Sequence, residues 1–140
     1  MNKILVAVFF LLVGFMLGKL DLKTVEANDQ QYTLSLCVTQ LDPSAVNKST
    51  RGWTFWFVKK EFSGGLNVKM SQVGPQPHHG VHSHAEDEVF YILQGQAEFT
   101  LQDESTVVGP NATLYCPSNI PHGIRNAGSD SLRYLVIKNN

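Results

Sequence analysis

The fold of this chain is decided by the stretch His82-Ser83-His84-Ala85-Glu86-Asp87-Glu88, together with His122 further along. Residues two apart on an extended strand point to the same face, so His82 and His84 can act together. Glu88 lies at a further even offset, and His122 must arrive from a distant strand, which only a closed or sandwiched sheet allows. Imidazole nitrogens with one carboxylate oxygen suit divalent Fe, Mn, Ni, Cu or Zn, so these four residues are predicted metal ligands.

The residues around these four strengthen the prediction. The β-branched and aromatic run Val89–Leu93 follows Glu88 and leads to a turn at Gly95. A second turn begins at Gly109-Pro110-Asn111. The pattern Pro117-x-Asn119-x-x-His122-x-x-x-Asn126 then places the fourth ligand at another transition from turn to strand.

This arrangement resembles the two motifs of the cupin family, G-x5-H-x-H-x3,4-E-x6-G and G-x5-P-x-G-x2-H-x3-N. The matching residues are His82, His84, Glu88 and Gly95 in the first motif, and Gly109, Pro117, His122 and Asn126 in the second. Two loops are longer, because seven residues separate Gly74 from His82 and Gly109 from Pro117, where the motifs have five. Asn119 replaces the middle glycine of the second motif. This change is mild because, among residues other than glycine, Asn tolerates a positive φ best.

The resemblance covers roughly residues 53 to 137 and implies an all-β double-stranded β-helix, or jelly-roll barrel. It also implies one divalent transition metal, held by the four ligands. Short strands separated by turns every 8 to 12 residues agree with such a sandwich or barrel. We therefore expect a single cupin domain over residues 28–140, without a substantial helix.

The sequence predicts where most strands lie. Leu34, Leu36 and Val38 alternate in a first strand, 32–39, which a loop with at most a short helix follows over 41–51. A strand at 53–58 is apolar on both faces, and Leu66, Val68 and Met70 alternate in the next strand. The remaining strands are expected at 89–93, 97–101, 106–108, 113–116, 122–126 and 132–137.

Composition limits the class of protein. With 140 residues, 43% of them hydrophobic and only 16% charged, the chain has room for one packed domain and is not of disordered type. The formal net charge is −1 without a basic run, so a nucleic-acid partner is not expected.

The first 27 residues read as a secretory signal peptide. A short positive start at Lys3 precedes the apolar run 4–18, and Val25-Glu26-Ala27 offers small residues for cleavage. The protein would then be exported to the periplasm or the extracellular space. The alternative is an uncleaved membrane anchor at residues 4–18, although this run is shorter than the ~20 residues that span a bilayer comfortably. In an oxidising compartment Cys37 and Cys116 could form a disulfide; otherwise both are small buried hydrophobic residues.

Several smaller predictions concern the surroundings of the site. Glu86 and Asp87 are expected to be solvated, unless one of them faces inward and orients a histidine. His78 and His79 are read as loop residues at the barrel mouth. The aromatic strand 53–58 lines the cavity, packs the core, or forms the interface of an expected homodimer.

A metal in an apolar barrel acts as a Lewis acid with exchangeable positions. With iron the expected reaction is that of a dioxygenase; with Mn, Ni or Zn it is that of an isomerase or lyase. The expected substrate is a small oxygen-rich molecule, with carbohydrate derivatives as one candidate class, and Tyr91 and Tyr115 are candidate general acids if they point inward. The alternatives are a non-catalytic metal-dependent binder of a small ligand and a barrel in which the metal is structural.

Overall fold

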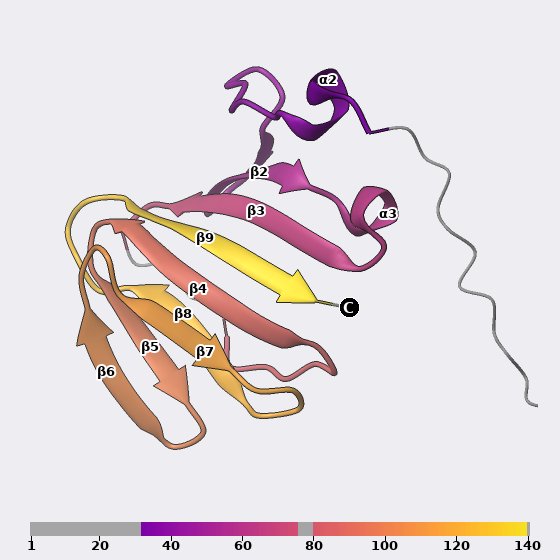
Figure 1. Cartoon of the computed structure of the whole chain (residues 1–140). Coiled ribbons are helices and arrows are strands. Elements are labelled where there is room, and N and C mark those ends of the chain that lie inside the picture. Colours follow the sequence, from indigo (N-terminus) through magenta and orange to yellow (C-terminus); the bar gives the residue numbers. More distant parts are fainter. Residues whose placement is uncertain (1–31, 76–79, 140) are drawn as a thin grey trace, which may run out of the picture. The chain divides into compact units, whose positions relative to one another are not determined.

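The structure is a computed structural model that describes residues 32–75 and 80–139 (Figure 1). The predicted signal peptide at 1–27, its alternative as an anchor at 4–18, and His78 and His79 lie outside the described residues. The chain from Thr33 onward forms one compact unit. No helix within the described ranges has the length and apolar character needed to cross a membrane.

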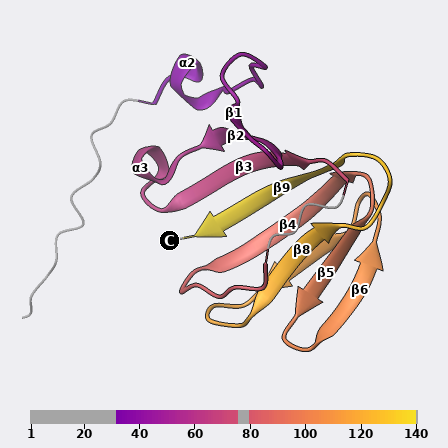
Figure 2. The ribbon, with the colours of Figure 1, turned by 180° about the vertical axis from the view of Figure 1, so that it is seen from behind.

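Antiparallel strands make up most of the described chain, as predicted. A six-stranded sheet has the order β1-β2-β3-β9-β4-β7, and a three-stranded sheet has the order β6-β5-β8 (Figures 1 and 2). In sequence order the elements are α2 (Leu34–Cys37), β1 (Asn47–Ser49), β2 (Gly52–Val58), α3 (Lys60–Ser63), β3 (Leu66–Val73), β4 (Asp87–Gln94), β5 (Ala97–Leu101), β6 (Glu104–Val108), β7 (Thr113–Cys116), β8 (His122–Asn126) and β9 (Leu132–Asn139). This two-sheet arrangement confirms the all-β jelly-roll prediction.

The apolar core lies between the two sheets. On β4 and β9, alternate residues point inward and are almost completely buried. The Phe90 ring lies 6.1 Å from Phe99 of the small sheet and 5.7 Å from Tyr134, measured between ring centroids. Burial of each such large side chain contributes roughly 1.5–3 kcal/mol. The main members of this core are Val73, Phe90, Ile92, Ala97, Phe99, Leu114, Cys116, Ile124, Leu132, Tyr134 and Val136.

The face of β3 that points into the barrel is not the face that carries the alternating apolar residues Leu66, Val68 and Met70. Lys69 and Ser71 line the same interior cavity as Glu88 and Phe90. Met70 lies on the opposite face, where it is buried beside its register partner Phe55 of β2. The alternation therefore marks the face of β3 that points away from the interior cavity, where Met70 and Phe55 are buried.

The first elements of the unit differ from the predictions. The predicted strand at 32–39 is instead the single helical turn α2, with Leu34 82% exposed, since these residues have no partner strand among the described elements. Conversely, Asn47–Ser49 of the predicted loop form β1, which pairs with Gly52–Thr54 at the start of β2. A second helical turn, α3, ends at Gly64, whose φ of 72° places it in the left-handed region.

The aromatic strand β2 is covered in part on both sides, as its composition suggests. All of its residues are buried or half-buried. On the outer face, the guanidinium carbon of Arg133 lies 5.9 Å from the Trp53 ring centroid, and the Phe55 and Phe57 rings meet edge to face. The expected homodimer through this strand stays a prediction.

The two cysteines are free thiols in the structure. Cys37 is exposed on α2, whereas Cys116 is completely buried on β7. Burial raises the pKa of the Cys116 thiol to about 12, so this residue is protonated and unreactive at neutral pH. Cys116 therefore packs as a small hydrophobic residue, which was one of the two expectations for it.

The turn between β4 and β5 depends on Gly95. Its φ is +85°, and a Cβ added there would lie 2.7 Å from the carbonyl oxygen of Ser131. Gly109, the opening glycine of the second motif, has no atom within 4 Å of an added Cβ and no positive φ in the left-handed range. The two motif glycines therefore differ in how strictly the fold requires them.

The Gly95→Ala variant tests this difference. We expect it to lower the free energy of unfolding by about 1–3 kcal/mol, because alanine would combine a strained φ with a backbone collision. Gly109→Ala is the matched control and should change stability by less than about 0.5 kcal/mol. Chemical denaturation of both variants measures the two values, and equal stability of the two would contradict the assignment.

Candidate metal centre

Two loops are held together at one end of the barrel by backbone hydrogen bonds. The amide nitrogen of His82 donates to the carbonyl oxygen of His122 at 2.9 Å, and the reverse bond measures 2.8 Å. The Asn119 amide donates to the His84 carbonyl at 2.7 Å. Asn119 adopts φ 61°, so it supplies the positive φ for which the family motif has glycine. These bonds bring the first-motif histidines beside the second-motif histidine.

The four predicted ligands converge. One donor atom from each of His82, His84, Glu88 and His122 lies within 4.8 Å of every other. The Oε2 atom of Glu88 is 3.4 Å from Nε2 of His84 and 3.1 Å from Nε2 of His122. Glu88 and His122 are 3% and 0% exposed, whereas His82 is exposed toward the opening. The structure thus brings together the whole set that the sequence singled out.

Backbone carbonyls orient all three imidazoles. The Nδ1 atoms of His82, His84 and His122 lie 3.0, 2.9 and 2.7 Å from the carbonyl oxygens of residues 80, 86 and 120, respectively. A neutral imidazole that donates its Nδ1 proton to a carbonyl keeps a lone pair on Nε2. Such outer partners fix the tautomer and the ring orientation of metal-binding histidines.

This arrangement fits a divalent cation. The donor atoms of three imidazoles and a carboxylate face one another at these distances, an arrangement that a positive charge among them stabilises. Imidazole nitrogen and carboxylate oxygen are also the donors that first-row divalent metals prefer. The chemistry of the donor set therefore supports a single metal ion in this position.

The two acidic residues before Glu88 support the loops in different ways. The Glu86 carboxylate lies 3.2 Å from Nδ1 of His84, so it orients this histidine, as the alternative reading allowed. Asp87 accepts hydrogen bonds from the Tyr115 hydroxyl and from the Ser118 amide. It thereby ties the start of β4 to the turn that precedes His122.

The sheet register gives the metal end of the barrel a polar character. Glu88 of β4 stands beside Lys138 of β9, and Lys138 stands beside Asn67 of β3. The Lys138 ammonium nitrogen is 2.8 Å from Nε2 of His84 and 3.3 Å from Oε1 of Glu88. The next row inward contains Lys69, whose register partners are Trp56 and Val136.

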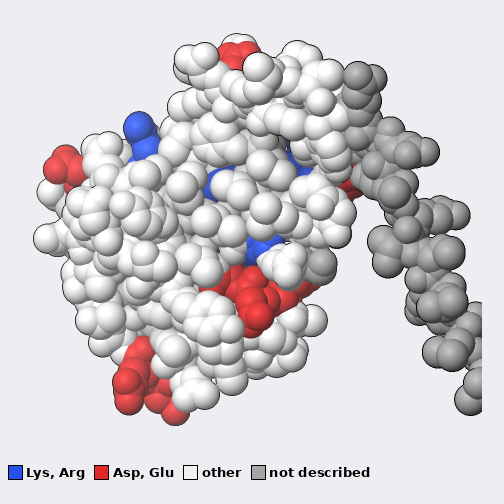
Figure 3. Space-filling view, in the orientation of Figure 1, with Lys and Arg blue, Asp and Glu red and all other residues white. Residues whose placement is uncertain are grey.

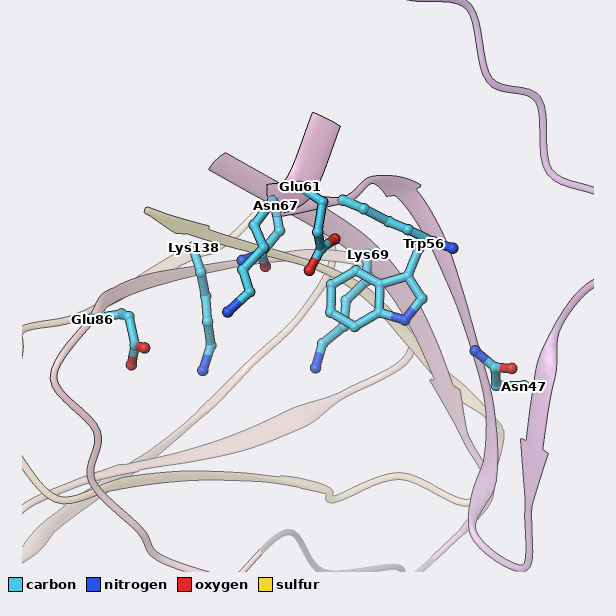
Figure 4. Close-up of a pocket in the computed structure, with 9 residues that line it drawn as sticks. Asn47, Trp56, Glu61, Asn67, Lys69, Glu86 and Lys138 are labelled. Carbon is cyan, nitrogen blue, oxygen red and sulfur yellow. The ribbon is translucent and has the colours of Figure 1, made fainter. Parts of the chain in front are cut away.

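Two cavities meet at these lysines. The inner cavity, of about 110 Å³, is lined by His82 and Glu88 together with Lys69, Lys138 and apolar core residues. The outer pocket, of about 480 Å³, shares Lys69 and Lys138 and has Trp56 on its wall (Figure 4). A space-filling view shows acidic atoms clustered close to basic ones on one face (Figure 3). A small molecule that passes from the outer pocket to the inner cavity therefore meets charged side chains.

Tyr91 and Tyr115, the candidate general acids, do not reach the site. Both lie on the face of β4 and β7 opposite to Glu88, because their positions have the other parity in the strand register. The Tyr91 hydroxyl donates to Asn111, and the Tyr115 hydroxyl donates to Asp87, which raises the pKa of Tyr115. Because Glu88 and Tyr91 are three residues apart on one strand, their side chains point to opposite faces. The sequence spacing alone therefore excludes a Tyr91 hydroxyl that faces the metal ligands.

Three residues that the sequence did not single out line the inner cavity, namely Lys69, Tyr134 and Lys138. Burial raises the pKa of Tyr134 to about 12, and burial lowers the pKa of Lys69. Each of the three lies at an even offset from an inward residue of its own strand, β3 or β9. This offset predicts an inward side chain only once the register of the two strands is known.

The fold and the donor set define a jelly-roll protein whose interior residues can hold a metal ion. Residues 70–138 match the sequence profile of the Cupin domain family. The chain thus carries a domain of the cupin superfamily. An uncharacterized protein of Methanocaldococcus jannaschii is 38% identical over 56 residues, which cover 39% of this chain and 45% of that protein. The matched segments span about half the length of the curated relatives.

Solved structures support the same fold. A predicted oxalate decarboxylase from Thermotoga maritima superposes with a TM-score of 0.59 and 22% identity, over 62% of this chain and 78% of the other. The DMSP lyase DddQ from Ruegeria pomeroyi gives a TM-score of 0.58 and 19% identity, over 76% of this chain and 57% of the other. At such identities the similarity establishes the fold.

The Glu88→Gln variant tests the metal centre. Glutamine keeps the size of the side chain but removes the negative charge, so we expect bound divalent metal to fall from about one equivalent to less than about one tenth. Thermal stability in the presence of metal should fall with it, because a metal held only by the folded state stabilises that state. The measurements are elemental analysis after dialysis and a melting curve.

Glu98→Gln is the matched control for this experiment. Glu98 lies on β5 and pairs with Arg125, away from the four ligands. Its replacement should leave metal content unchanged. A Glu88→Gln protein that retains a full equivalent of metal would remove the carboxylate from the ligand set.

Proposed function

We propose that this protein is a metal-dependent enzyme of the isomerase, lyase or dioxygenase type that acts on a small oxygen-rich molecule. The observation that carries the proposal is the convergence of four metal donors beside a cavity that continues into a larger pocket. A metal held by His82, His84, Glu88 and His122 would supply Lewis-acid chemistry toward a substrate oxygen. Two proteins of similar fold carry the names DMSP lyase and predicted oxalate decarboxylase, which are names of enzymes that act on small molecules.

The chain itself would contribute orientation and exclusion of water. The three imidazoles are held by backbone carbonyls, so they need no reorganisation when a ligand arrives. Beneath the site, Phe90, Ile124 and Val136 form an apolar wall of the inner cavity. Such a wall strengthens electrostatic interactions with a bound substrate, because it lowers the local dielectric constant.

A non-catalytic binder of a small ligand is the second candidate. The placement of Tyr91 and Tyr115 away from the site favours it, because these were the proposed proton donors. Both candidates need the same metal ligands, so only turnover separates the enzyme from the binder.

For either candidate we propose that residues 1–27 direct the chain out of the cytoplasm.

A substrate screen decides between enzyme and binder. The full chain is loaded separately with Fe(II), Mn(II), Ni(II) and Zn(II), then incubated with carbon-13-labelled oxalate, DMSP and glucuronate, and carbon-13 NMR follows each substrate. We expect one combination of metal and substrate to give product, and Glu88→Gln to abolish it. Saturable binding with every substrate unchanged would overturn the enzymatic proposal and establish the binder.

A further inference from the structure

We propose that Lys69 and Lys138 form an anion-recognition pair, which selects substrates that carry a carboxylate group. This inference rests on the proposed function and specifies its substrate class. Both lysines line the inner cavity with the metal ligands and also the outer pocket. Any molecule that passes from the outer pocket to the metal centre therefore meets both ammonium groups.

The position of Lys69 is unfavourable for a charged side chain without such a role. It projects from β3 into the barrel between Trp56 and Val136, which are its register partners on both sides. Its ammonium nitrogen lies 5.3 Å from the Trp56 ring centroid, and within the described residues it makes no direct ion pair, although the charge of Glu88 acts on it from further away. A partly buried cation normally has an anionic partner, and a substrate carboxylate would provide one.

Lys138 has partners in the structure, but they belong to residues that a metal would use. Its ammonium nitrogen lies 2.8 Å from Nε2 of His84 and 3.3 Å from Oε1 of Glu88. Once Nε2 of His84 coordinates a metal ion, its lone pair is no longer available to Lys138, whereas Oε1 of Glu88 can still accept one of the three ammonium protons. The Lys138 ammonium can then donate its remaining hydrogen bonds to an anionic group beside the metal.

The charge balance around the pocket favours an anion. The outer pocket is lined by four lysines, Lys59, Lys60, Lys69 and Lys138, against two glutamates, Glu61 and Glu86. Figure 4 shows the side chains of Lys69 and Lys138 extending in the same direction, with the Trp56 ring beside Lys69. A divalent metal with one carboxylate ligand would add a further positive charge. The whole chain has a formal net charge of −1, so this positive balance is a local feature.

The two cavities also limit the size of the ligand. The inner cavity of about 110 Å³ has room for a small polar head group, whereas the outer pocket of about 480 Å³ has room for the rest of the molecule. A short organic acid fits the two cavities, with one of its oxygen atoms directed to the metal and its carboxylate group held by the two lysines. Trp56 would then contact the carbon chain.

Paired probes test the proposal, namely succinate and its neutral analogue succinamide. Isothermal titration calorimetry is carried out on the full chain after metal loading. We expect succinate to bind at least about 10-fold more tightly than succinamide, because hydrogen bonds to a charged group are the stronger ones. Lys69→Met should remove that preference while metal content and succinamide binding stay unchanged. Lys69→Arg, which keeps the charge, should restore most of it.

Lys48→Met is the matched control, since Lys48 is exposed on β1 and lines neither of the two cavities. It should bind both probes as the unmodified protein does. Equal affinities for the two probes, no binding of either, or an unchanged succinate affinity in Lys69→Met would overturn the lysine assignment. Metal content measured on the same samples separates this failure from failure of the metal centre on which the proposed function rests, because the latter would show as protein that takes up no metal.

Discussion

Two backbone hydrogen bonds between His82 and His122 bring the candidate metal ligands of two distant chain segments together. They join a loop that follows β3 to the first residue of β8, although the two residues are far apart in the sequence. This short antiparallel bridge positions the imidazole of His122 so that it faces Glu88, which belongs to the other sheet. The bridge also closes one end of the barrel, so the same contact shapes both the fold and the site.

The strand register then divides the interior into a polar end and an apolar end. Asn67, Lys138, Glu88 and Cys116 form one row across β3, β9, β4 and β7, and the rows further in are mainly apolar. The polar row is costly to bury unless its charges compensate one another or bind ions. Lys138 neutralises part of the negative charge of Glu88, and a metal among the imidazoles would compensate the remaining negative potential.

Much of the fold and the ligand set follows from sequence. Strands predicted at 97–101, 113–116 and 122–126 coincide with β5, β7 and β8, because turn residues delimit them clearly, and the alternation of Leu66, Val68 and Met70 lies within β3. The inward face of β3 could not be predicted, since both faces carry apolar residues and the long-range pairing with β9 decides between them. The position of Lys138 beside Glu88 depends on the same pairing. One-turn helices such as α2 are too short to leave a helical period.

Anomalous X-ray diffraction from crystals of the zinc-loaded full chain tests the central claim most directly. The account predicts one anomalous peak at about 2.0–2.2 Å from the Nε2 atoms of His82, His84 and His122 and from a carboxylate oxygen of Glu88. The Nδ1 atoms should remain bonded to their backbone carbonyls. Zinc bound through Nδ1, zinc bound elsewhere on the chain, or a protein that binds no zinc would each contradict the account.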